Sequence, residues 1–280
     1  MGLGLIVLNF SCKEKEPEKQ FAWQFDKVIT LDGVNPIGIA DSKDGLWLSD
    51  GDHNRVLLID AQGDIKTTID SLERPMHIAL ENDHLYIPQY GNDVVSDYRV
   101  SGSNAAFSEV ISLSDSLDAP AAVAVRGSEK AIVDFYNHRI LFSEKEGDWI
   151  SFGKEGNYQG DFYFPTDVQI TDSLIWVADA YNNRIQTFDK KGNWKKVIGA
   201  DQGMNAATGL YVSENAVFVA DFENNRVLVF DQEGELKQTL TDYILKPIDV
   251  LVQDDRLITL NFRKGELVVY LWKELISISK

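Results

Sequence analysis

A six-fold internal repeat with a constant internal spacing constrains this 280-residue chain more than any other feature of its sequence. A Pro-x-x-aliphatic segment recurs at intervals of 39 to 45 residues, and fourteen residues after each anchor a polar residue ends a β-rich run. The anchors are Pro36, Pro75, Pro120, Pro165, Ala207 (in place of proline) and Pro247, and the polar residues are Asp50, Gln89, Asp134, Asp179, Asp221 and Asn261. Because an offset that is unchanged in six copies is hard to obtain by chance, the sequence predicts six equivalent units.

Each unit has the pattern of a small antiparallel sheet. The run before the polar residue is apolar or alternating, as in Leu46–Ser49 and Ile175–Ala178, and a second β run such as Val227–Phe230 follows after a short turn. Each unit therefore encodes three or four short strands and no helix of any length. One such sheet cannot bury both of its faces, whereas six sheets packed radially around an axis can, with only short edges left exposed.

The predicted fold is therefore all-β: a six-bladed β-propeller of four-stranded antiparallel blades, formed as one domain by residues 21–280. Two all-β sandwiches are the competing interpretation, but they would not carry one repeat through the whole chain. Closure of the ring needs one blade built from both chain ends. The β-rich segment Phe21–Ile29 precedes the first anchor and is predicted to supply the outer strand of the last blade, with the tail Leu275–Ser279 as the competing candidate.

The repeats resemble the NHL family of β-propellers. The resemblance rests on the connector Phe152–Pro165, which is typical of the links between NHL repeats, and on motifs that run from the strand-ending aspartate to an arginine. These motifs are Asp50–Arg55, Asp134–Arg139, Asp179–Arg184 and Asp221–Arg226. Repeats two and six depart, because Gln89 and Asn261 replace the aspartate and Val94 and Glu266 take the arginine position. The resemblance implies the fold and says little about function, because propellers support many unrelated activities.

The aspartate and arginine of each motif are predicted to be structural. The aspartate ends a strand and can accept backbone N–H bonds from its own turn, and the arginine begins the next strand within reach of that carboxylate. A catalytic group is rarely needed four times, whereas a pair that fixes a turn is useful in every blade. No Asp–Arg pair is expected in repeats two and six.

The composition limits the partners. The chain has 27 Lys and Arg residues against 44 Asp and Glu residues, which gives a formal net charge of −17. A body this acidic repels phosphate backbones, so no nucleic-acid partner is expected. The single cysteine, Cys12, excludes internal disulfides and a Cys-based structural zinc site.

The N-terminus resembles that of a bacterial lipoprotein. Residues 3–10 are mostly apolar and too short to span a bilayer, which needs about 20 residues, but they suit the apolar region of a signal peptide. Cys12 follows at once, after Leu8, Asn9, Phe10 and Ser11, and a charged spacer comes next. The resemblance implies a signal segment at residues 1–11, a lipid anchor on Cys12, a polar tether over residues 12–20 and a place in the cell envelope. Asn9 and Phe10 depart from the usual residues, and the alternative is an apolar N-terminus with an incidental cysteine.

Three polar residues are predicted to meet on the propeller axis. The innermost strand starts at the anchor, so the residue two positions later is expected to face the channel. Small residues take this place in repeats one, three and five, whereas His77, Asp167 and Asp249 take it in repeats two, four and six. One imidazole and two carboxylates are a reasonable ligand set for Zn²⁺ or Mn²⁺ and a poor one for Ca²⁺. Two related propeller groups, the gluconolactonase-like hydrolases and the amidating lyases, use axial metals, but their fuller ligand sets cannot be placed here. The alternative is that the three residues are solvated channel walls.

Aromatic residues mark a second candidate surface. One or two positions after the strand-ending polar residue stand Tyr90, Phe135, Tyr136, Tyr181 and Phe222, which are therefore predicted to lie on one rim of the propeller. Together with Asp52, Asp179 and Glu223 they would form a contact surface for a protein or glycan partner. The alternative is local packing between neighbouring blades.

The preferred functional hypothesis is a lipid-anchored propeller of the cell envelope that binds a protein or glycan, as a monomer and without a cofactor. The alternative is a metal-dependent lyase or hydrolase with one Zn²⁺ or Mn²⁺ held at the axis by His77, Asp167 and Asp249. A ligand set with one nitrogen and two carboxylates must be completed by water and binds divalent ions weakly unless its neighbours are strongly organised. No tightly held transition metal is therefore expected.

Overall fold

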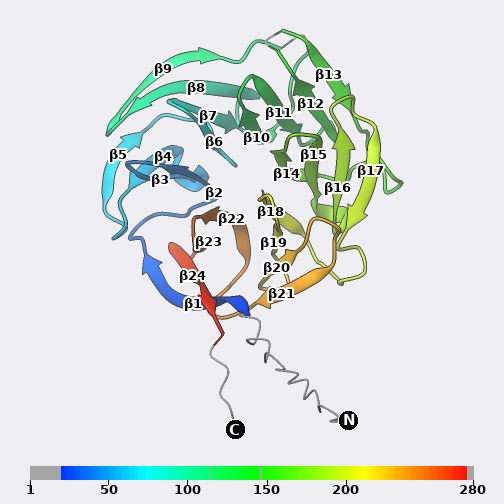
Figure 1. Cartoon of the computed structure of the whole chain (residues 1–280). Coiled ribbons are helices and arrows are strands. Elements are labelled where there is room, and N and C mark those ends of the chain that lie inside the picture. The colour runs from blue at the N-terminus through cyan, green and yellow to red at the C-terminus, as the bar shows by residue number, and fades with distance from the viewer. Residues whose placement is uncertain (1–19, 114, 146, 276–280) are drawn as a thin grey trace, which may run out of the picture.

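The computed structural model describes residues 20–113, 115–145 and 147–275. These residues form six four-stranded antiparallel sheets around a central axis, as Figure 1 shows, so the predicted six-bladed β-propeller is confirmed. The helical elements of the described part are two short 3-10 helices, η1 (Gly51–His53) and η2 (Ala180–Asn182). None of its helices is long and apolar enough to cross a membrane.

In the first five blades, four consecutive strands pair in chain order. Blade 1 contains β2 (Gly38–Ser42), β3 (Gly45–Asp50), β4 (Arg55–Ile59) and β5 (Ile65–Ile69). Blade 2 contains β6 (Ala79–Glu81), β7 (His84–Gln89), β8 (Val94–Ser101) and β9 (Asn104–Val110). Blade 3 contains β10 (Pro120–Arg126), β11 (Glu129–Asp134), β12 (Arg139–Ser143) and β13 (Trp149–Phe152). Blade 4 contains β14 (Pro165–Ile170), β15 (Leu174–Asp179), β16 (Arg184–Asp189) and β17 (Trp194–Ile198). Blade 5 contains β18 (Ala207–Val212), β19 (Val217–Asp221), β20 (Arg226–Phe230) and β21 (Leu236–Leu240).

Blade 6 is built from both ends of the chain. Its inner strands are β22 (Pro247–Gln253), β23 (Arg256–Asn261) and β24 (Glu266–Glu274), and its outer strand is β1 (Phe21–Thr30). β1 pairs antiparallel with β24 from Phe21 opposite Glu274 to Thr30 opposite Glu266. The predicted closure by the N-terminal strand is therefore confirmed, and Figure 1 shows β1 and β24 side by side in this blade. Residues 276–279 of the competing tail lie outside the described residues.

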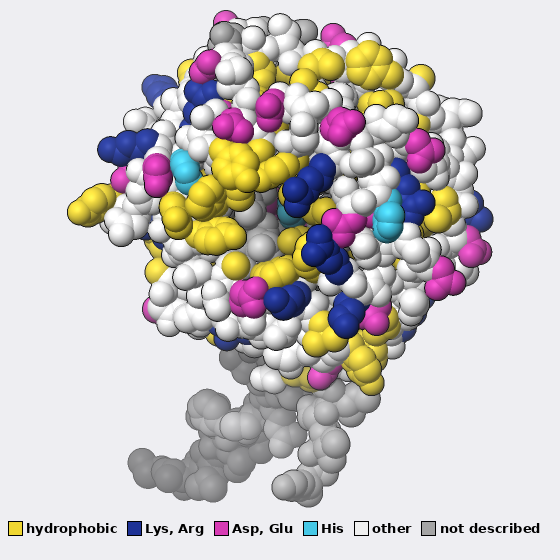
Figure 2. Space-filling view, turned by 180° about the vertical axis from the view of Figure 1, so that it is seen from behind, with side chains coloured by type: hydrophobic (Ala, Val, Ile, Leu, Met, Phe, Trp, Pro, Cys, Tyr) yellow, Lys and Arg dark blue, Asp and Glu magenta, His cyan; other side chains and the backbone are white. Residues whose placement is uncertain are grey.

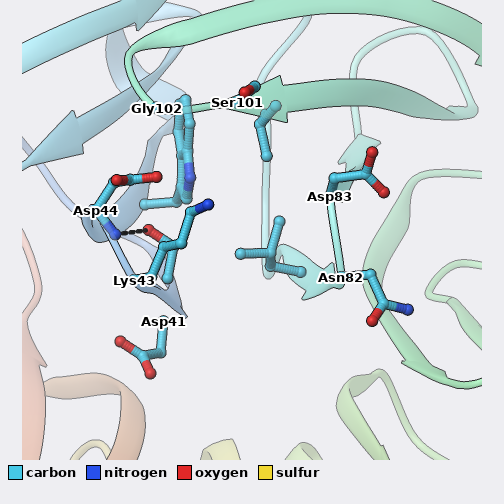
Figure 3. Close-up of a pocket in the computed structure, with 11 residues that line it drawn as sticks. Asp41, Lys43, Asp44, Asn82, Asp83, Ser101 and Gly102 are labelled. Atoms are coloured by element: carbon cyan, nitrogen blue, oxygen red, sulfur yellow. Dashed lines mark hydrogen bonds between the residues drawn. The ribbon is translucent and has the colours of Figure 1, made fainter.

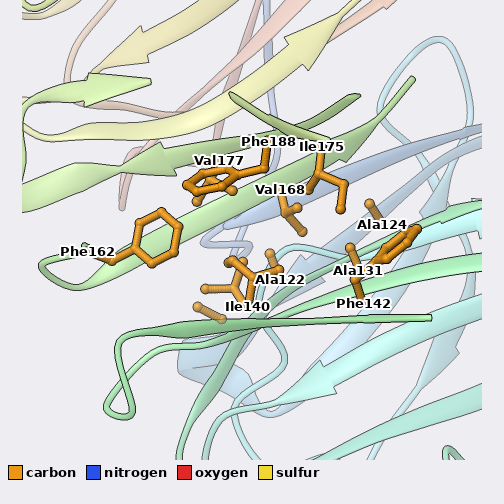
Figure 4. Close-up of a cluster of buried hydrophobic side chains, with 12 residues drawn as sticks. Ala122, Ala124, Ala131, Ile140, Phe142, Phe162, Val168, Ile175, Val177 and Phe188 are labelled. Atoms are coloured by element: carbon orange, nitrogen blue, oxygen red, sulfur yellow. The ribbon is translucent and has the colours of Figure 1, made fainter. Parts of the chain in front are cut away.

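The hydrophobic core is divided into six clusters, one between each pair of neighbouring blades. Figure 4 shows the cluster between blades 3 and 4, where Ile140 and Phe142 face Val168 and Ile175. All four side chains are at most 1% exposed. Because each sheet buries both faces against its neighbours, the stability of the fold depends on the ring being complete.

The strand-ending polar residue attaches each blade to the loop that enters it. One of its oxygens accepts a backbone N–H from that loop at 2.7–3.3 Å in all six blades. In the four blades with the full motif, the arginine Nε donates to the other oxygen of the same carboxylate at 2.6–2.9 Å. The pairs are Asp50–Arg55, Asp134–Arg139, Asp179–Arg184 and Asp221–Arg226, and each aspartate is 0% exposed.

The two blades without the motif keep a hydrogen-bonded pair of different chemistry. In blade 6 the Asn261 side-chain amide donates to the Glu266 carboxylate at 2.8 Å, so donor and acceptor exchange positions relative to an Asp–Arg pair. In blade 2 the Gln89 amide donates to the Ser96 hydroxyl at 2.7 Å. The Asp–Arg pair is absent in both blades, but its contribution to the turn is retained.

A second repeated contact joins each blade to the next. The residue four positions after the strand-ending polar residue is left-handed in blades 1 to 5, with φ between 51° and 62°, and its side chain accepts the N–H of the residue before the next anchor at 2.8–3.0 Å. Short polar side chains tolerate this backbone region best, which explains why these residues are Asn54, Asp93, His138, Asn183 and Asn225. In blade 6 the equivalent position is Gly265, which is also left-handed (φ 61°) but has no side chain to accept this bond. At the junction of blades 6 and 1, Arg263 instead pairs with Asp52 at 2.8 Å.

Candidate functional site

A bulge at the start of the innermost strands builds the axial site. In blades 3 to 6 the pairing register shifts directly after the anchor, for example between Pro165 and Asp167. Because a bulge re-aims the side chain that it carries, it can turn the third residue of the strand, two positions after the anchor, toward the channel. The structure brings together the three residues that the sequence placed on the axis: ligand atoms of His77, Asp167 and Asp249 lie within 4.8 Å of one another, and all three side chains are buried.

The small residues that alternate with these three have a steric role. A Cβ atom on Gly38 would lie 2.7 Å from the Cα atom of His77, and one on Gly209 would lie 2.5 Å from the Cα atom of Asp249. Both distances are too short for a side chain. Blades 1 and 5 therefore carry glycine where blades 2 and 6 carry a polar ligand, because the backbones of neighbouring blades approach closely at the axis.

Both axial aspartates also join neighbouring blades. The Asp167 carboxylate accepts the N–H of Val168 in its own strand at 2.7 Å and that of Leu210 in blade 5 at 2.7 Å. The Asp249 carboxylate accepts the N–H of Val250 at 2.8 Å and that of Ile39 in blade 1 at 3.0 Å. These four bonds fix both carboxylates in place, and Asp249 does so across the junction that closes the ring.

His77 is held by its backbone and leaves its imidazole without a hydrogen bond at Nδ1. The backbone N–H of His77 donates to the Ala121 carbonyl at 3.1 Å, and its carbonyl accepts from Val123 at 3.3 Å, so this residue pairs with blade 3. Its Nδ1 atom lies 3.3 Å from Oδ2 of Asp249, yet forms no hydrogen bond within the described residues. The imidazole of His77 therefore presents a buried nitrogen atom to the carboxylates of Asp167 and Asp249.

The axial group attracts positive charge. Burial disfavours the imidazolium, but the carboxylates of Asp249 and Asp167 outweigh it and raise the pKa of His77 to about 9. Burial also raises the pKa of Asp167 to about 7, against the effect of His77 and with that of Asp249. A proton on His77 compensates for one of the two carboxylates, and a bound cation would compensate for both.

The axial group lies in a cavity of about 210 Å³ along the channel. Gln169, Tyr211 and Asp41 also line this cavity, and the sequence interpretation missed them. Gln169 stands two positions after Asp167, and Tyr211 stands two positions after Gly209. Because residues two apart in a strand face the same side, this spacing could have predicted both from the sequence. Oδ1 of Asp41 has no hydrogen-bond partner among the described residues, and burial raises the pKa of this carboxyl group.

A larger groove of about 560 Å³ lies between blades 1 and 2. Figure 3 shows Lys43 and Asp44 on one side of it and Asn82 and Asp83 on the other, with Ser101 and Gly102 at a third hairpin. The four facing residues are exposed, and Asp83 pairs with Arg99 at 2.8 Å. Asp41 lines both this groove and the axial cavity, whereas the other charged side chains of the groove are exposed.

The structure places four of the five predicted rim aromatics in one patch. Tyr90 donates to Tyr136 through their hydroxyl groups at 2.6 Å, Phe135 and Tyr136 pack at 5.1 Å between ring centres, and Tyr181 reaches them through Phe164. Tyr136 is 49% exposed and Tyr181 is 60% exposed. On the face seen in Figure 2, hydrophobic side chains gather along one side of a central hollow, and Lys and Arg side chains lie on the other side.

Two details of the rim differ from the sequence interpretation. Phe222 lies outside the patch and packs against Phe262, which the interpretation missed although Phe262 also follows a strand-ending polar residue. The three acidic residues predicted to join the aromatics in the contact surface are buried or paired. Asp179 is buried, Asp52 pairs with Arg263 at 2.8 Å, and Glu223 pairs with Lys246 at 3.3 Å.

Three cations stack on rim aromatics. Arg74 lies over Tyr90, Lys246 over Phe222 and Arg263 over Phe262, each 4.8–5.2 Å from the ring centre. Tyr163 and Phe164, which directly precede the anchor of blade 4, extend the patch and were also missed. Cys12 lies outside the described residues, so the structure does not bear on the lipid anchor.

Comparisons with known proteins agree with this architecture. Residues 204–230, in blade 5, match the family model of the NHL repeat, which confirms the predicted resemblance. No curated protein matches the sequence.

Solved structures of similar fold include two enzymes. The chain is similar to a gluconolactonase from Xanthomonas campestris, with 14% identity, a TM-score of 0.70 and coverage of 88% of this chain and 89% of that one. It is similar to virginiamycin B lyase from Staphylococcus aureus, with 12% identity, a TM-score of 0.64 and coverage of 90% and 99%. It is also similar to a protein of unknown function from Bacteroides thetaiotaomicron, with 15% identity, a TM-score of 0.67 and coverage of 91% and 77%. At these identities the likeness shows the fold alone.

Proposed function

Because the chain is a six-bladed β-propeller that carries an NHL repeat, we propose that it is a binding module of the cell envelope, anchored by a lipid on Cys12, that binds a protein partner through its aromatic rim. The observation that carries the proposal is the patch of contacting aromatic rings on blades 2 to 4. Its most exposed members, Tyr136, Tyr163 and Tyr181, are 39–60% exposed.

The composition of the rim supports a protein partner. Tyr, Phe and Arg are the residues enriched at the centres of protein interfaces, because they supply large rigid contact areas together with a polar end. The rim carries Tyr136 and Tyr181 beside an arginine that is already stacked on Tyr90. Because Tyr136, Tyr163 and Tyr181 are all exposed, the patch is an open surface of the kind that fits a folded protein. A glycan partner is the other outcome of the test below.

The rim is tested by removing two exposed rings. The double variant Tyr136→Ala, Tyr181→Ala is expected to lose partner binding by about 2 kcal/mol or more, as for other interface aromatics. The photo-crosslinking residue is placed at position 163, which is exposed and can report the contact. A buried position such as 185 could not reach a partner. The measurement is crosslinking of the full chain to one defined envelope protein of its host, compared between the parent and the variant.

The matched control is Phe107→Ala, which removes a ring that is 58% exposed on the outer strand β9. The parent and this control should form the same crosslinked product, and the rim variant should not. Equal crosslinking by all three proteins, or retention of a purified glycan in place of a protein, would refute the protein-binding rim.

The anchor is tested by fractionating host cells. Full-length protein is expected in the membrane fraction, and Cys12→Ser is expected in the soluble fraction, because one thiol carries the only proposed anchor. A Ser11→Ala variant leaves the cysteine intact and serves as the control. The anchor proposal fails if Cys12→Ser remains membrane-bound, and this result would leave the rim proposal open to its own test.

A second candidate function is lyase or hydrolase chemistry in the axial cavity. The observation that favours it is that five titratable side chains line this one cavity: Asp41, His77, Asp167, Tyr211 and Asp249. A lyase and a gluconolactonase share the fold, but at 12% and 14% identity these activities belong to those two proteins alone. Turnover of small lactones by the full chain, abolished in Asp41→Asn and retained in the rim variant, would support catalysis over binding.

A further inference from the structure

We propose that His77, Asp167 and Asp249 bind one divalent metal ion, Zn²⁺ in preference to Mn²⁺, which ties blades 2, 4 and 6 together at the propeller axis. The proposal goes beyond the binding function, which does not use the axial cavity. It rests on three buried ligand groups within 4.8 Å of one another and on the Nδ1 atom of His77, which faces Asp249 at ion-pair distance but forms no hydrogen bond among the described residues.

The spacing of the ligand atoms suits a small metal ion. Zinc ligands lie about 2.0–2.2 Å from the metal, so two ligands of a tetrahedral site are roughly 3.3–3.5 Å apart. Nδ1 of His77 and Oδ2 of Asp249 are 3.3 Å apart without a hydrogen bond between them. The ligand atom of Asp167 lies within 4.8 Å of the other two, so the three groups converge on one point at the axis.

Both carboxylates remain able to coordinate. An ionised carboxylate offers about four acceptor positions. The described hydrogen bonds use two on Asp167 and two on Asp249, one on each oxygen. Those N–H groups also fix the orientation of each carboxylate, which is the role that neighbouring groups play in metal sites.

The donor set selects among metals. One imidazole nitrogen and two carboxylate oxygens suit zinc with water as the fourth ligand, and the axial cavity of about 210 Å³ can hold that water. Affinity for such a set rises from Mn²⁺ to Zn²⁺. Ca²⁺ prefers six to eight oxygen ligands, which this group does not provide.

The structure changes the expectation that was drawn from the sequence. A weak site was expected because nothing in the sequence showed organised neighbours around His77. The structure supplies that organisation as backbone N–H groups from blades 1, 4, 5 and 6 and as glycines that admit the ligands. The ligands are far apart in the chain, so the unfolded protein has no such site, and metal binding must stabilise the folded ring.

The test measures metal content and thermal stability of the full chain. Protein stripped with a chelator, mixed with Zn²⁺ and desalted should retain one zinc per chain, and its Tm should rise with zinc concentration. His77→Ala and Asp167→Asn should each weaken zinc binding about tenfold or more. Binding of Mn²⁺ by the parent should be weaker than binding of Zn²⁺.

The matched control is His84→Ala. His84 is also a histidine beside two aspartates, with Nδ1 at 2.7 Å from Asp97 and Nε2 at 3.8 Å from Asp83, but it is partly exposed. This variant should keep one zinc per chain and the parent's zinc-dependent rise in Tm.

A parent protein that retains no zinc after desalting would overturn the proposal, and so would parental zinc binding in Asp167→Asn. Zinc lost in His84→Ala rather than in the axial variants would place the ion at the surface and count equally against it. Asp167→Asn preserves the shape of the side chain, so it gives an answer even if His77→Ala does not fold. The visible spectrum of the Co²⁺-loaded parent should change on His77→Ala if the imidazole is a ligand.

Discussion

At the scale of single residues, the buried Asp–Arg pairs make a specific prediction. Asp179 is 0% exposed and accepts from Tyr163, Asn182 and Arg184, whose side chain is itself only 12% exposed. Asp179→Ala should lower the free energy of unfolding by about 3–5 kcal/mol, because it leaves the largely buried guanidinium of Arg184 with backbone carbonyl acceptors but without its carboxylate counter-charge. Denaturant titration of the full chain measures this loss.

The control for that prediction is Asp189→Ala, which removes an aspartate with a similar turn and a lysine partner at the protein surface. A clearly smaller loss is expected there, because water screens the exposed pair. Equal losses in the two variants would show that the burial of Asp179 does not determine its contribution.

The residues of the motif could be predicted from the sequence only in part. The sequence predicts an Asp–Arg pair because the same spacing between the two residues recurs in four blades. The spacing cannot show which other residue types would preserve the hydrogen bond in the remaining two blades. Asn261 with Glu266 and Gln89 with Ser96 keep it by exchanging donors and acceptors, and only the geometry shows this. The rim shows the same limit of sequence patterns. The position of Tyr136 and Tyr181 after a strand-ending residue predicted that they are exposed, but it could not show that Asp179 is buried.

At the scale of elements, strand positions followed from the repeat, whereas pairing between blades did not. The inner strand of blade 2 is reduced to β6, Ala79–Glu81, because the backbone of His77 pairs with blade 3 instead of with its own sheet. No local pattern signals this exchange, because it depends on how closely two blades approach at the axis. The bulge in blades 3 to 6 has the same origin, so the sequence could place the axial residues but not the N–H groups that orient them.

At the scale of the whole molecule, the core is a ring of interfaces with no separate centre. Each of the six clusters draws residues from two neighbouring blades, so losing one blade exposes two interfaces. This arrangement explains why the repeat predicted the fold so completely, since six equal units have one compact way to bury both faces of every sheet. It also makes the junction between blades 6 and 1 the point on which cooperative folding depends.

Deleting residues 21–31 tests that dependence. The deletion removes β1, and with it the buried Trp23 and the strand that covers the outer edge of β24. Cooperative thermal unfolding of the entire domain should then be lost, because blade 6 no longer completes its interfaces with blades 5 and 1.

Deleting residues 276–280 instead should leave the melting transition intact, because the outer strand of blade 6 is β1. A peptide of residues 20–31 added to the first deletion should restore the transition in proportion to its concentration, as expected for a ligand that binds only the folded form. A deletion of residues 21–31 that melts like the parent would contradict the role assigned to β1, since a ring that stays cooperative without this strand is not closed by it.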